Sequence, residues 1–404
     1  MSLHIPDFRL IFSKDIGERN AGAYYFSQLF HSLIFLAPIW VPYYLARITA
    51  AEMSILFVAM YLSQMFFELP SGALADMIGR RQTILWGFVV AGISYVIYPL
   101  FPTFWWFLFL AICMGAADAF RSGSEEALLY DTYIQIGDEE RFSGVYANGN
   151  VIYQVGLIIS AAVGGILFGI NEHVPFILYG VSLLIGATAA LRYIEPKIDS
   201  VKFSISSYFS QIKLGTQEAF KSEYSKYLSL FFIFVGGISW SSTLYFNDFI
   251  MASLVPGDAL RGIIFACMRI INVLVVMIVL QNTKIFNWSR TIIFFQIIML
   301  LGYLPGAWLY GFVGVPFVLF AQIATTARWV ILAPITNKVF SSKYRATAIS
   351  ALSLLIGVVY VALTGASSFL VPLLGIRVMF SLLGVITLVT VVPIGLKLLR
   401  VPGN

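Results

Sequence analysis

Long, uninterrupted runs of apolar residues recur along the chain, and they restrict what it can fold into. Residues 102–117 and 382–396 are two examples. A membrane-spanning helix needs about 20 mostly apolar residues, and segments of this kind follow one another through the sequence. Of the 404 residues, 59% are hydrophobic and only 11% are charged, whereas soluble domains carry roughly 25% charged residues. The chain is therefore expected to use lipid as its solvent.

Helices are the form that these apolar runs are expected to take. Inside a bilayer every backbone polar group must be bonded internally, which leaves helices and closed barrels. The runs lack the alternation of apolar and polar residues that barrel strands show. We predict an all-α integral membrane protein with twelve transmembrane helices, near residues 21–46, 53–75, 82–101, 103–132, 143–169, 174–194, 226–248, 259–281, 289–312, 314–338, 346–370 and 375–397.

The longest hydrophilic segment, residues 195–225, divides the predicted helices into two sets of six. The sequence thus predicts two pseudo-symmetric six-helix bundles, in residues 1–194 and 226–404, joined by a cytoplasmic linker. The linker mixes apolar and polar residues, which suits either a helix lying at the membrane interface or a loose connection. Paired bundles of this kind typically move around a binding site near the middle of the bilayer.

The basic residues indicate how the chain is oriented. Most of the 25 Lys and Arg residues fall before the first predicted helix, in the linker, and in other segments on the same side. Cytoplasmic loops are rich in Lys and Arg, so both termini are predicted to be cytoplasmic and the protein to lie in the cell inner (plasma) membrane. The net charge of +5 then follows from topology, without a nucleic-acid partner. Cys113 and Cys267 lie in apolar runs, which argues against a disulfide framework or a metal site.

The segment between the second and third predicted helices reads Gly-Ala-Leu-Ala-Asp-Met-Ile-Gly-Arg-Arg over residues 72–81. It resembles the loop signature of the major facilitator superfamily (MFS), in which two glycines, an aspartate and two basic residues are fixed. Glu68 and residues 122–131 also resemble a bacterial, drug-efflux-like branch of that family. The resemblance implies the MFS fold and transport by alternating access.

The same resemblance implies a conformational latch on the cytoplasmic side. Asp76 would meet the N-terminus of a helix that begins near Arg345, where the helix dipole favours an anion, and Arg80 would reach Asp131. The alternative is that Arg80 and Arg81 only follow the rule that basic residues stay inside. The latch residues of this hypothesis are Gly72, Asp76, Gly79, Arg80, Arg81, Asp131, Arg345 and Glu68.

The fifth predicted helix contains a second family-like pattern. Residues 156–169 read Gly-Leu-Ile-Ile-Ser-Ala-Ala-Val-Gly-Gly-Ile-Leu-Phe-Gly. They resemble the signature of drug–proton antiporters, with Ser160 and Ala161 in place of a glycine and a proline. Small residues at this spacing also allow ordinary close packing between helices, so both interpretations stay open.

Ionisable residues inside predicted spans are candidates for function, because inserting one costs about 2.5–3.5 kcal/mol. Asp118, Arg121 and Glu125 in the fourth predicted helix are spaced by three and four residues, so they share one face. One hypothesis is a site for proton coupling or substrate, in which a partly desolvated carboxylate exchanges protons. The other is a ladder of charges that neutralise one another and stabilise the helix.

The second half contains a different set of candidates. Arg269, with Asn272 close by, and Arg328 lie at mid-depth in their predicted helices, where no acidic residue of that half is expected. Arginine binds carboxylate and phosphate through two parallel hydrogen bonds, so these residues are predicted to hold an anionic part of the substrate. Alternatively, they pair with Asp118 or Glu125 as a gate between the halves, or bind backbone carbonyl groups.

Two polar residues of the first two predicted helices complete the candidate site. His31 lies near the centre of the first helix, where it is either a proton carrier or a hydrogen-bonded core residue. Gln64 lies in the second helix, in a run that is otherwise mostly apolar.

These observations favour a secondary active transporter over an enzyme. The sequence contains no HExxH, GxSxG or P-loop motif, so we predict no catalytic residue, no metal and no cofactor. The leading prediction is proton-coupled efflux of a small amphipathic or anionic compound by a monomer. The alternatives are proton-coupled uptake of an organic anion and lipid flipping. The expected partners are the substrate, protons and membrane lipid.

Overall fold

The computed structural model describes residues 7–197, 205–280, 287–341 and 344–401, and every regular element in these ranges is helical. Contacts between residues divide the chain into two compact units. Unit 1 comprises Met1–Ile48, Leu56–Ser204 and Asp258–Ala266. Unit 2 comprises Thr49–Ile55, Ile205–Gly257 and Cys267–Asn404.

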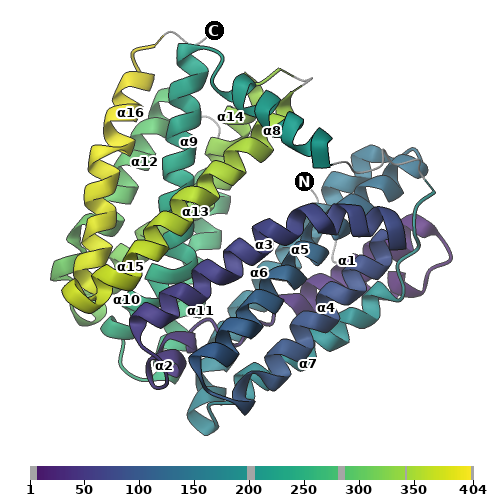
Figure 1. Ribbon diagram of the computed structural model, residues 1–404, viewed down its shortest axis with the longest axis horizontal. Helices are drawn as coiled ribbons and strands as arrows, with labels where there is room; N and C mark the ends of the chain where they lie inside the picture. The colour runs from purple at the N-terminus through teal and green to yellow at the C-terminus, as the bar shows by residue number, and fades with distance from the viewer. Residues whose placement is uncertain (1–6, 198–204, 281–286, 342–343, 402–404) are drawn as a thin grey trace. The chain divides into compact units, whose positions relative to one another are not determined.

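Unit 1 is built from the N-terminal helices (Figure 1). They are η1 (Phe8–Phe12), α1 (Ile16–His31), α2 (Trp40–Leu45), most of α3 (Ala50–Ile78), α4 (Arg80–Ile97), η2 (Tyr98–Leu100), α5 (Phe104–Gln135), α6 (Glu139–Ile170) and α7 (Val174–Ala190).

Glycines let the helices of unit 1 approach one another closely. A Cβ atom on Gly92 would lie 3.0 Å from the carbonyl oxygen of Gly180, so α4 and α7 lie side by side with their backbones nearly in contact (Figure 1). A Cβ atom on Gly149 would lie 2.1 Å from the ring of Tyr24, where α6 meets α1. Small residues at such crossings are the usual means of close packing between membrane helices. This packing brings α1, α5 and α6 together around the candidate site.

Unit 2 contains the C-terminal helices (Figure 1), and three π-helical turns occur among its described residues. Turns of this kind occur frequently at functional sites. The elements are α8 (Ile205–Ala219), α9 (Glu223–Ser241), η3 (Ser242–Phe246), α10 (Asn247–Leu254), the second half of α11 (Asp258–Val275), η4 (Val276–Leu280), α12 (Trp288–Tyr303), η5 (Leu304–Trp308), η6 (Gly311–Gly314), α13 (Val315–Ala327), η7 (Arg328–Leu332), α14 (Ala333–Val339), α15 (Arg345–Val389) and α16 (Val391–Leu398). The first half of α11, residues 258–266, belongs to unit 1.

Helix α8 falls within the hydrophilic segment 195–225, where the sequence predicts either an interfacial helix or a loose connection. It packs against the start of α15, since a Cβ atom on Gly215 would lie 2.2 Å from the carbonyl oxygen of Thr347. Glu218, near the end of α8, accepts a hydrogen bond from the backbone N–H of Ser341 at 2.8 Å. Helix α8 is therefore docked onto the other elements of unit 2. Its position at the membrane interface, and the predicted linker bounds, stay predictions.

Nine helical stretches within the described residues are long and apolar enough to cross a membrane, and α7 is a shorter apolar helix. The prediction of an all-helical, multi-pass membrane protein is thus confirmed for the described chain. The nine are Ala50–Glu68, Arg80–Leu100, Phe104–Gln135, Glu139–Ile170, Glu223–Leu254, Asp258–Ile278, Trp288–Trp308, Gly311–Leu332 and Thr347–Leu398.

The boundaries differ from the predicted ones at both ends of the chain. The predicted first helix, 21–46, is interrupted between His31 and Trp40. Pro38 lies in this interruption; it lacks a backbone N–H and disfavours helical backbone in the residue before it. The last two predicted helices form one stretch, within which Gly375 has a non-helical φ of 78°. The count of twelve helices therefore stays a prediction.

Candidate functional site

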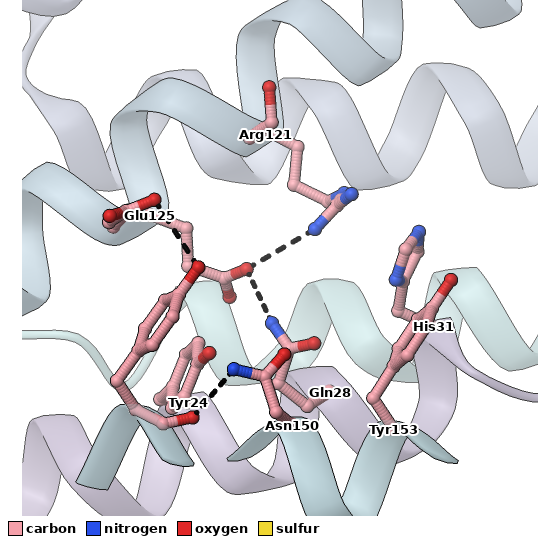
Figure 2. Close-up of a pocket in the computed structure, with 10 residues that line it drawn as sticks. Tyr24, Gln28, His31, Arg121, Glu125, Asn150 and Tyr153 are labelled. Atoms are coloured by element: carbon pink, nitrogen blue, oxygen red, sulfur yellow. Dashed lines mark hydrogen bonds and ion pairs between the residues drawn. The ribbon is translucent and has the colours of Figure 1, made fainter. Parts of the chain in front are cut away.

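A polar cavity of about 250 Å³ lies among α1, α5 and α6 in unit 1. Its volume lies just below the usual range for small-molecule sites, which is roughly 300–1,000 Å³. Aromatic, amide and charged side chains from the three helices point into it (Figure 2). The lining residues are Tyr24, Gln28, His31, Arg121, Ser122, Glu125, Glu126, Tyr146, Asn150 and Tyr153.

Arg121 and Glu125 form an ion pair at this cavity. They lie one turn apart on α5, so both side chains leave the same face of the helix, and Nη1 of Arg121 is 3.3 Å from Oε2 of Glu125. Glu125 is only 2% exposed. The guanidinium group of Arg121 also lies 5.7 Å from the centre of the Phe88 ring. A buried ion pair is therefore built into the wall of the cavity.

Three further donors surround the Glu125 carboxylate, and Figure 2 shows one of them, Gln28. Gln28 donates to Oε2 at 3.1 Å, and the hydroxyl groups of Ser27 and Tyr193 donate to Oε1, the latter at 2.9 Å. An ionised carboxylate is only an acceptor, so four donors, counting Arg121, satisfy the charged form. Adding a proton to Glu125 requires at least one of these hydrogen bonds to rearrange.

Two aromatic stacks form another part of the cavity wall. The rings of His31 and Tyr153 stack with centres 5.4 Å apart and an interplanar angle of 25°. The rings of Tyr24 and Tyr146 are 6.2 Å apart and nearly parallel, at 12°. Nδ1 of His31 is buried and has no hydrogen-bond partner among the described residues. The cavity thus offers flat apolar faces beside its charged groups.

The second cavity carboxylate, Glu126, has a different environment from Glu125. Its side chain is exposed, and the hydroxyl group of Tyr146 lies 3.5 Å from its Oε2, which is long for a hydrogen bond. Among the residues that the structure describes, Glu126 forms no ion pair within 4.0 Å. Adjacent residues of α5 therefore present one enclosed and one open carboxylate.

The other predicted residues of unit 1 lie away from the cavity. Asp118 interacts electrostatically with Arg121 from one turn earlier on α5 but does not line the cavity. Gln64 lies on α3, where its backbone N–H faces Gly115 of α5. Within the described residues, no three or more His, Cys, Asp and Glu side chains are grouped to hold a metal ion.

One of the predicted residues of unit 2 lies in a π-helical turn. Arg328 is the first residue of η7 and is 2% exposed. Its guanidinium carbon lies 4.2 Å from the ring centre of Trp329 and 5.7 Å from that of Trp240. Asn272 donates a hydrogen bond to Thr326 at 2.7 Å, and Arg269 is half-buried on α11. The Arg328 side chain is therefore enclosed by aromatic rings.

Several latch residues make contacts within unit 1. Gly79 has a φ of 93°, which favours glycine, at the turn before α4. Arg80 forms a half-buried ion pair with Asp131. Arg81 donates to the carbonyl groups of Ala190 and Leu191 at the end of α7, at 3.1 and 2.9 Å.

The remaining latch residues are not placed in comparable contacts. The surroundings of Gly72 and the side chain of Asp76 lie outside what the structure describes. Glu68 is exposed in the second half of α3, and Arg345 is the exposed first residue of α15. Whether these residues act together as a latch stays a prediction.

Three contributors to these networks were not among the predicted site residues. Ser27 and Tyr193 bind Glu125, and the Glu195 carboxylate accepts hydrogen bonds from the backbone N–H groups of Arg80 and Arg81 at 2.8 and 2.9 Å. That carboxylate thereby caps the N-terminus of α4, where a helix favours an anion. Ser27 and Tyr193 have no motif around them, so only their position in space identifies them.

The sequence matches the family model described as Major Facilitator Superfamily over residues 23–332. It is 22% identical over 202 residues to an uncharacterized MFS-type transporter, YxaM, of Bacillus subtilis (strain 168), covering 50% of this chain and 49% of that protein. It is 29% identical over 134 residues to the tetracycline resistance protein, class C, of Escherichia coli, covering 32% of this chain and 33% of that protein. The chain thus aligns with half or less of the length of these relatives.

Solved structures with the same fold cover nearly the whole chain. The nucleoside transporter NupG superposes with a TM-score of 0.72 at 11% identity, covering 96% of this chain and 100% of that one. A bacterial homolog of the human lysosomal transporter Spinster, inward-facing and unoccupied, gives 0.71 at 15% identity, covering 96% and 98%. At these identities the likeness shows the fold alone.

Proposed function

The chain belongs to the major facilitator superfamily and is a membrane transporter, and we propose that it couples efflux of a small amphipathic compound to proton entry through Glu125. The observation that carries this proposal is the enclosed carboxylate of Glu125, paired with Arg121 and turned toward a cavity of solute size. This arrangement places a carboxylate that can exchange protons beside a cavity that can hold the solute. The protein then acts without catalytic chemistry.

The coupling step follows from the hydrogen bonds of Glu125. When the carboxylate is ionised, it holds Arg121, Gln28 and two hydroxyl groups in place. A proton on Glu125 removes the negative charge that holds Arg121. The guanidinium group is then free to move, which changes the charge and shape of the cavity that binds the solute. Solute and proton therefore compete through a shared set of hydrogen bonds. This competition is what exchange transport in opposite directions requires.

Efflux is proposed over uptake for two reasons. Relatives named tetracycline resistance proteins match part of the chain, and residues 156–169 resemble an antiporter pattern. We further propose that the protein is a monomer in the inner membrane with both termini in the cytoplasm, and that it works by alternating access with the latch residues. These proposals rest on the distribution of basic residues and on the Arg80–Asp131 ion pair.

One observation favours a second candidate, the proton-coupled uptake of an organic anion. Arg328 is a cationic side chain enclosed by Trp240 and Trp329 in unit 2, and an arginine in such a setting binds carboxylates or phosphates well. Under this alternative the direction of flux reverses and the substrate is anionic. Direction and charge preference are measured in the same assay.

The test is flux into proteoliposomes that contain the full-length protein, with tetracycline and proflavine as efflux probes and benzoate as an anion probe. An imposed pH gradient, acid inside, is expected to drive accumulation of an efflux probe, and an ionophore that dissipates the gradient should abolish it. Glu125→Gln keeps the shape of the side chain but cannot ionise, so gradient-driven flux should fall by at least tenfold.

The matched control is Glu139→Gln, which neutralises an exposed glutamate in the first turn of α6. It should keep the wild-type response to the gradient. Full gradient-driven flux in the Glu125→Gln variant would remove Glu125 from the coupling mechanism. Gradient-driven accumulation of benzoate, but of neither efflux probe, with the outside acidic would replace efflux by anion uptake.

A further inference from the structure

We infer that Glu126 and the aromatic side chains beside it form a recognition site for planar organic cations, distinct in role from the proton-coupling pair. The inference deepens the proposed function and rests on it for the direction of transport. It assigns the ligand's charge to Glu126 and the ligand's ring to the stacked tyrosines. The two neighbouring carboxylates of α5 would thus have different roles.

Charge balance in the cavity is the first argument. Arg121 and Glu125 lie 3.3 Å apart and neutralise each other. The four donors to Glu125 also occupy its oxygen atoms, so it has little capacity left for a ligand. Glu126 is exposed and has only the 3.5 Å contact with the Tyr146 hydroxyl group among its described contacts. One negative charge therefore remains open to a cationic ligand.

Stacked rings are the second argument, because they continue from the cavity along unit 1. Tyr24 and Tyr146 line the cavity and stack on each other at 6.2 Å. Phe142, one turn before Tyr146 on α6, lies 5.7 Å from it at 28°. Tyr130, one turn after Glu126 on α5, lies 5.2 Å from Phe142 in an edge-on arrangement. We call Tyr24, Tyr146, Phe142 and Tyr130 the aromatic ladder.

The ladder connects the cavity with an exposed ring near one end of α5. Its members run toward the turn that joins α5 to α6, at residues 136–138. Tyr130 is 42% exposed, whereas Tyr24 is buried at the cavity. Each ring presents a negative face that attracts a cation, at about 0.5–1 kcal/mol when exposed and about 2 kcal/mol when desolvated. A planar cation can therefore move from ring to ring toward Glu126.

The geometry also predicts which compounds would bind poorly. A cation without a ring satisfies Glu126 but gains nothing from stacking, and aromatic contacts contribute about 0.5–1.5 kcal/mol beyond buried area. A planar anion can stack, but it is repelled by the excess negative charge. The site therefore selects for two features together, a positive charge and a flat ring system.

Equilibrium binding to the detergent-purified full-length protein tests this inference without a pH gradient. Three probes separate the features: proflavine, a planar tricyclic cation; tetraethylammonium, a cation without rings; and anthracene-2-carboxylate, a planar tricyclic anion. Proflavine binding is followed by fluorescence anisotropy, and the other two by competition. Wild-type protein should bind proflavine at least tenfold more tightly than either competitor.

Variants identify the groups responsible. Glu126→Gln and Tyr146→Leu should each weaken proflavine binding by roughly threefold to thirtyfold, whereas Tyr146→Phe keeps the ring and should bind like wild type. Tyr310→Leu, an exposed tyrosine in unit 2, is the control and should change nothing. Thermal melts verify that each variant is folded. If the Glu126→Gln variant fails to fold, the comparison of proflavine binding between Tyr146→Leu and Tyr146→Phe tests the inference instead.

Three results would overturn the inference: wild-type affinity in the Glu126→Gln variant, equal binding of the three probes, or no proflavine binding by the wild-type protein. These outcomes are distinct from failure of the proposed function. Selective proflavine binding without gradient-driven flux contradicts proton-coupled efflux alone. Gradient-driven flux of tetracycline together with unselective binding contradicts the planar-cation site alone.

Discussion

Tyr193 donates a hydrogen bond of 2.9 Å to Oε1 of Glu125, although 68 residues separate them in the sequence. Tyr193 lies just beyond the end of α7 and is 1% exposed, and Glu125 lies on α5. The bond ties the end of one helix to the charged group of another. Because Ser27 and Gln28 on α1 also donate to this carboxylate, its environment depends on α1, on α5 and on the segment after α7.

Replacing Tyr193 by Phe should destabilise the protein, because one of four donors to a buried carboxylate disappears while the ring still fills its space. Hydrogen bonds to charged groups contribute roughly 1.5–3 kcal/mol, so the free energy of unfolding should fall by about that amount. Thermal melts in detergent provide the measurement. Tyr130→Phe, which removes an exposed hydroxyl group with no described hydrogen bond, should leave the melting temperature within error. Equal melting temperatures for the two variants would contradict the assignment.

Gly115 and Gly123, both on α5, should respond in opposite ways to replacement by Ala. A Cβ atom on Gly115 would lie 2.1 Å from the carbonyl oxygen of Met60, whereas one on Gly123 would meet nothing within 4 Å. Overpacking costs about 1–3 kcal/mol, while Ala in an open helical position gains about 0.5–1 kcal/mol over Gly. Melting temperatures should therefore fall for Gly115→Ala and hold or rise for Gly123→Ala. A loss of stability in the Gly123→Ala variant alone would show that α3 and α5 do not cross closely at Gly115.

The stability contributed by Glu218 should depend on pH. Burial alone would raise the pKa of Glu218, but hydrogen bonds from Lys221 and Ser341 outweigh it and lower the pKa below its ordinary value of 4.5. Nζ of Lys221 is 2.6 Å from Oε1. A carboxyl group whose pKa falls on folding stabilises the protein at neutral pH. That contribution is lost as the pH falls from about 4.5 through the lower pKa of the folded state.

The measurement is the difference in melting temperature between wild-type protein and Glu218→Gln, taken from pH 7 downward. The difference should be largest at neutral pH and shrink below about pH 4.5. Glu223→Gln removes an exposed glutamate from the first turn of α9 and serves as the control for a general change in charge. A difference for Glu218→Gln that grows as the pH falls would show that the hydrogen bonds do not outweigh burial.

Several features could be predicted from local sequence because their causes are local. Apolar runs of helical length require a membrane and require internal backbone hydrogen bonds, so helices could be predicted near 103–132 and 143–169. The structure has them at Phe104–Gln135 and Glu139–Ile170. The spacing of Arg121 and Glu125 placed them on one face of a helix, and they form an ion pair. The motif at residues 72–81 indicated the family that the family model confirms.

Other features depended on local backbone chemistry that hydropathy does not register. The apolar content of residues 21–46 predicts one continuous helix. The structure has an interruption there between His31 and Trp40, where Pro38 disfavours helical backbone. The predicted last two helices form one stretch with a single non-helical residue, Gly375, inside it. Hydropathy indicates whether a segment prefers lipid or water, but it does not indicate where the backbone leaves the helical conformation.

The sequence by itself determined that this chain is a helical membrane protein of a known transporter family, because hydrophobic length and a contiguous motif are read along the chain. Only the tertiary structure decided which polar residues surround Glu125, that Asp118 and Gln64 lie off the cavity, and that Glu126 stays open beside the aromatic ladder. The physical reason is that a hydrogen bond acts over about 3 Å. Residues as distant in sequence as Ser27, Glu125 and Tyr193 reach that range only through the packing of helices.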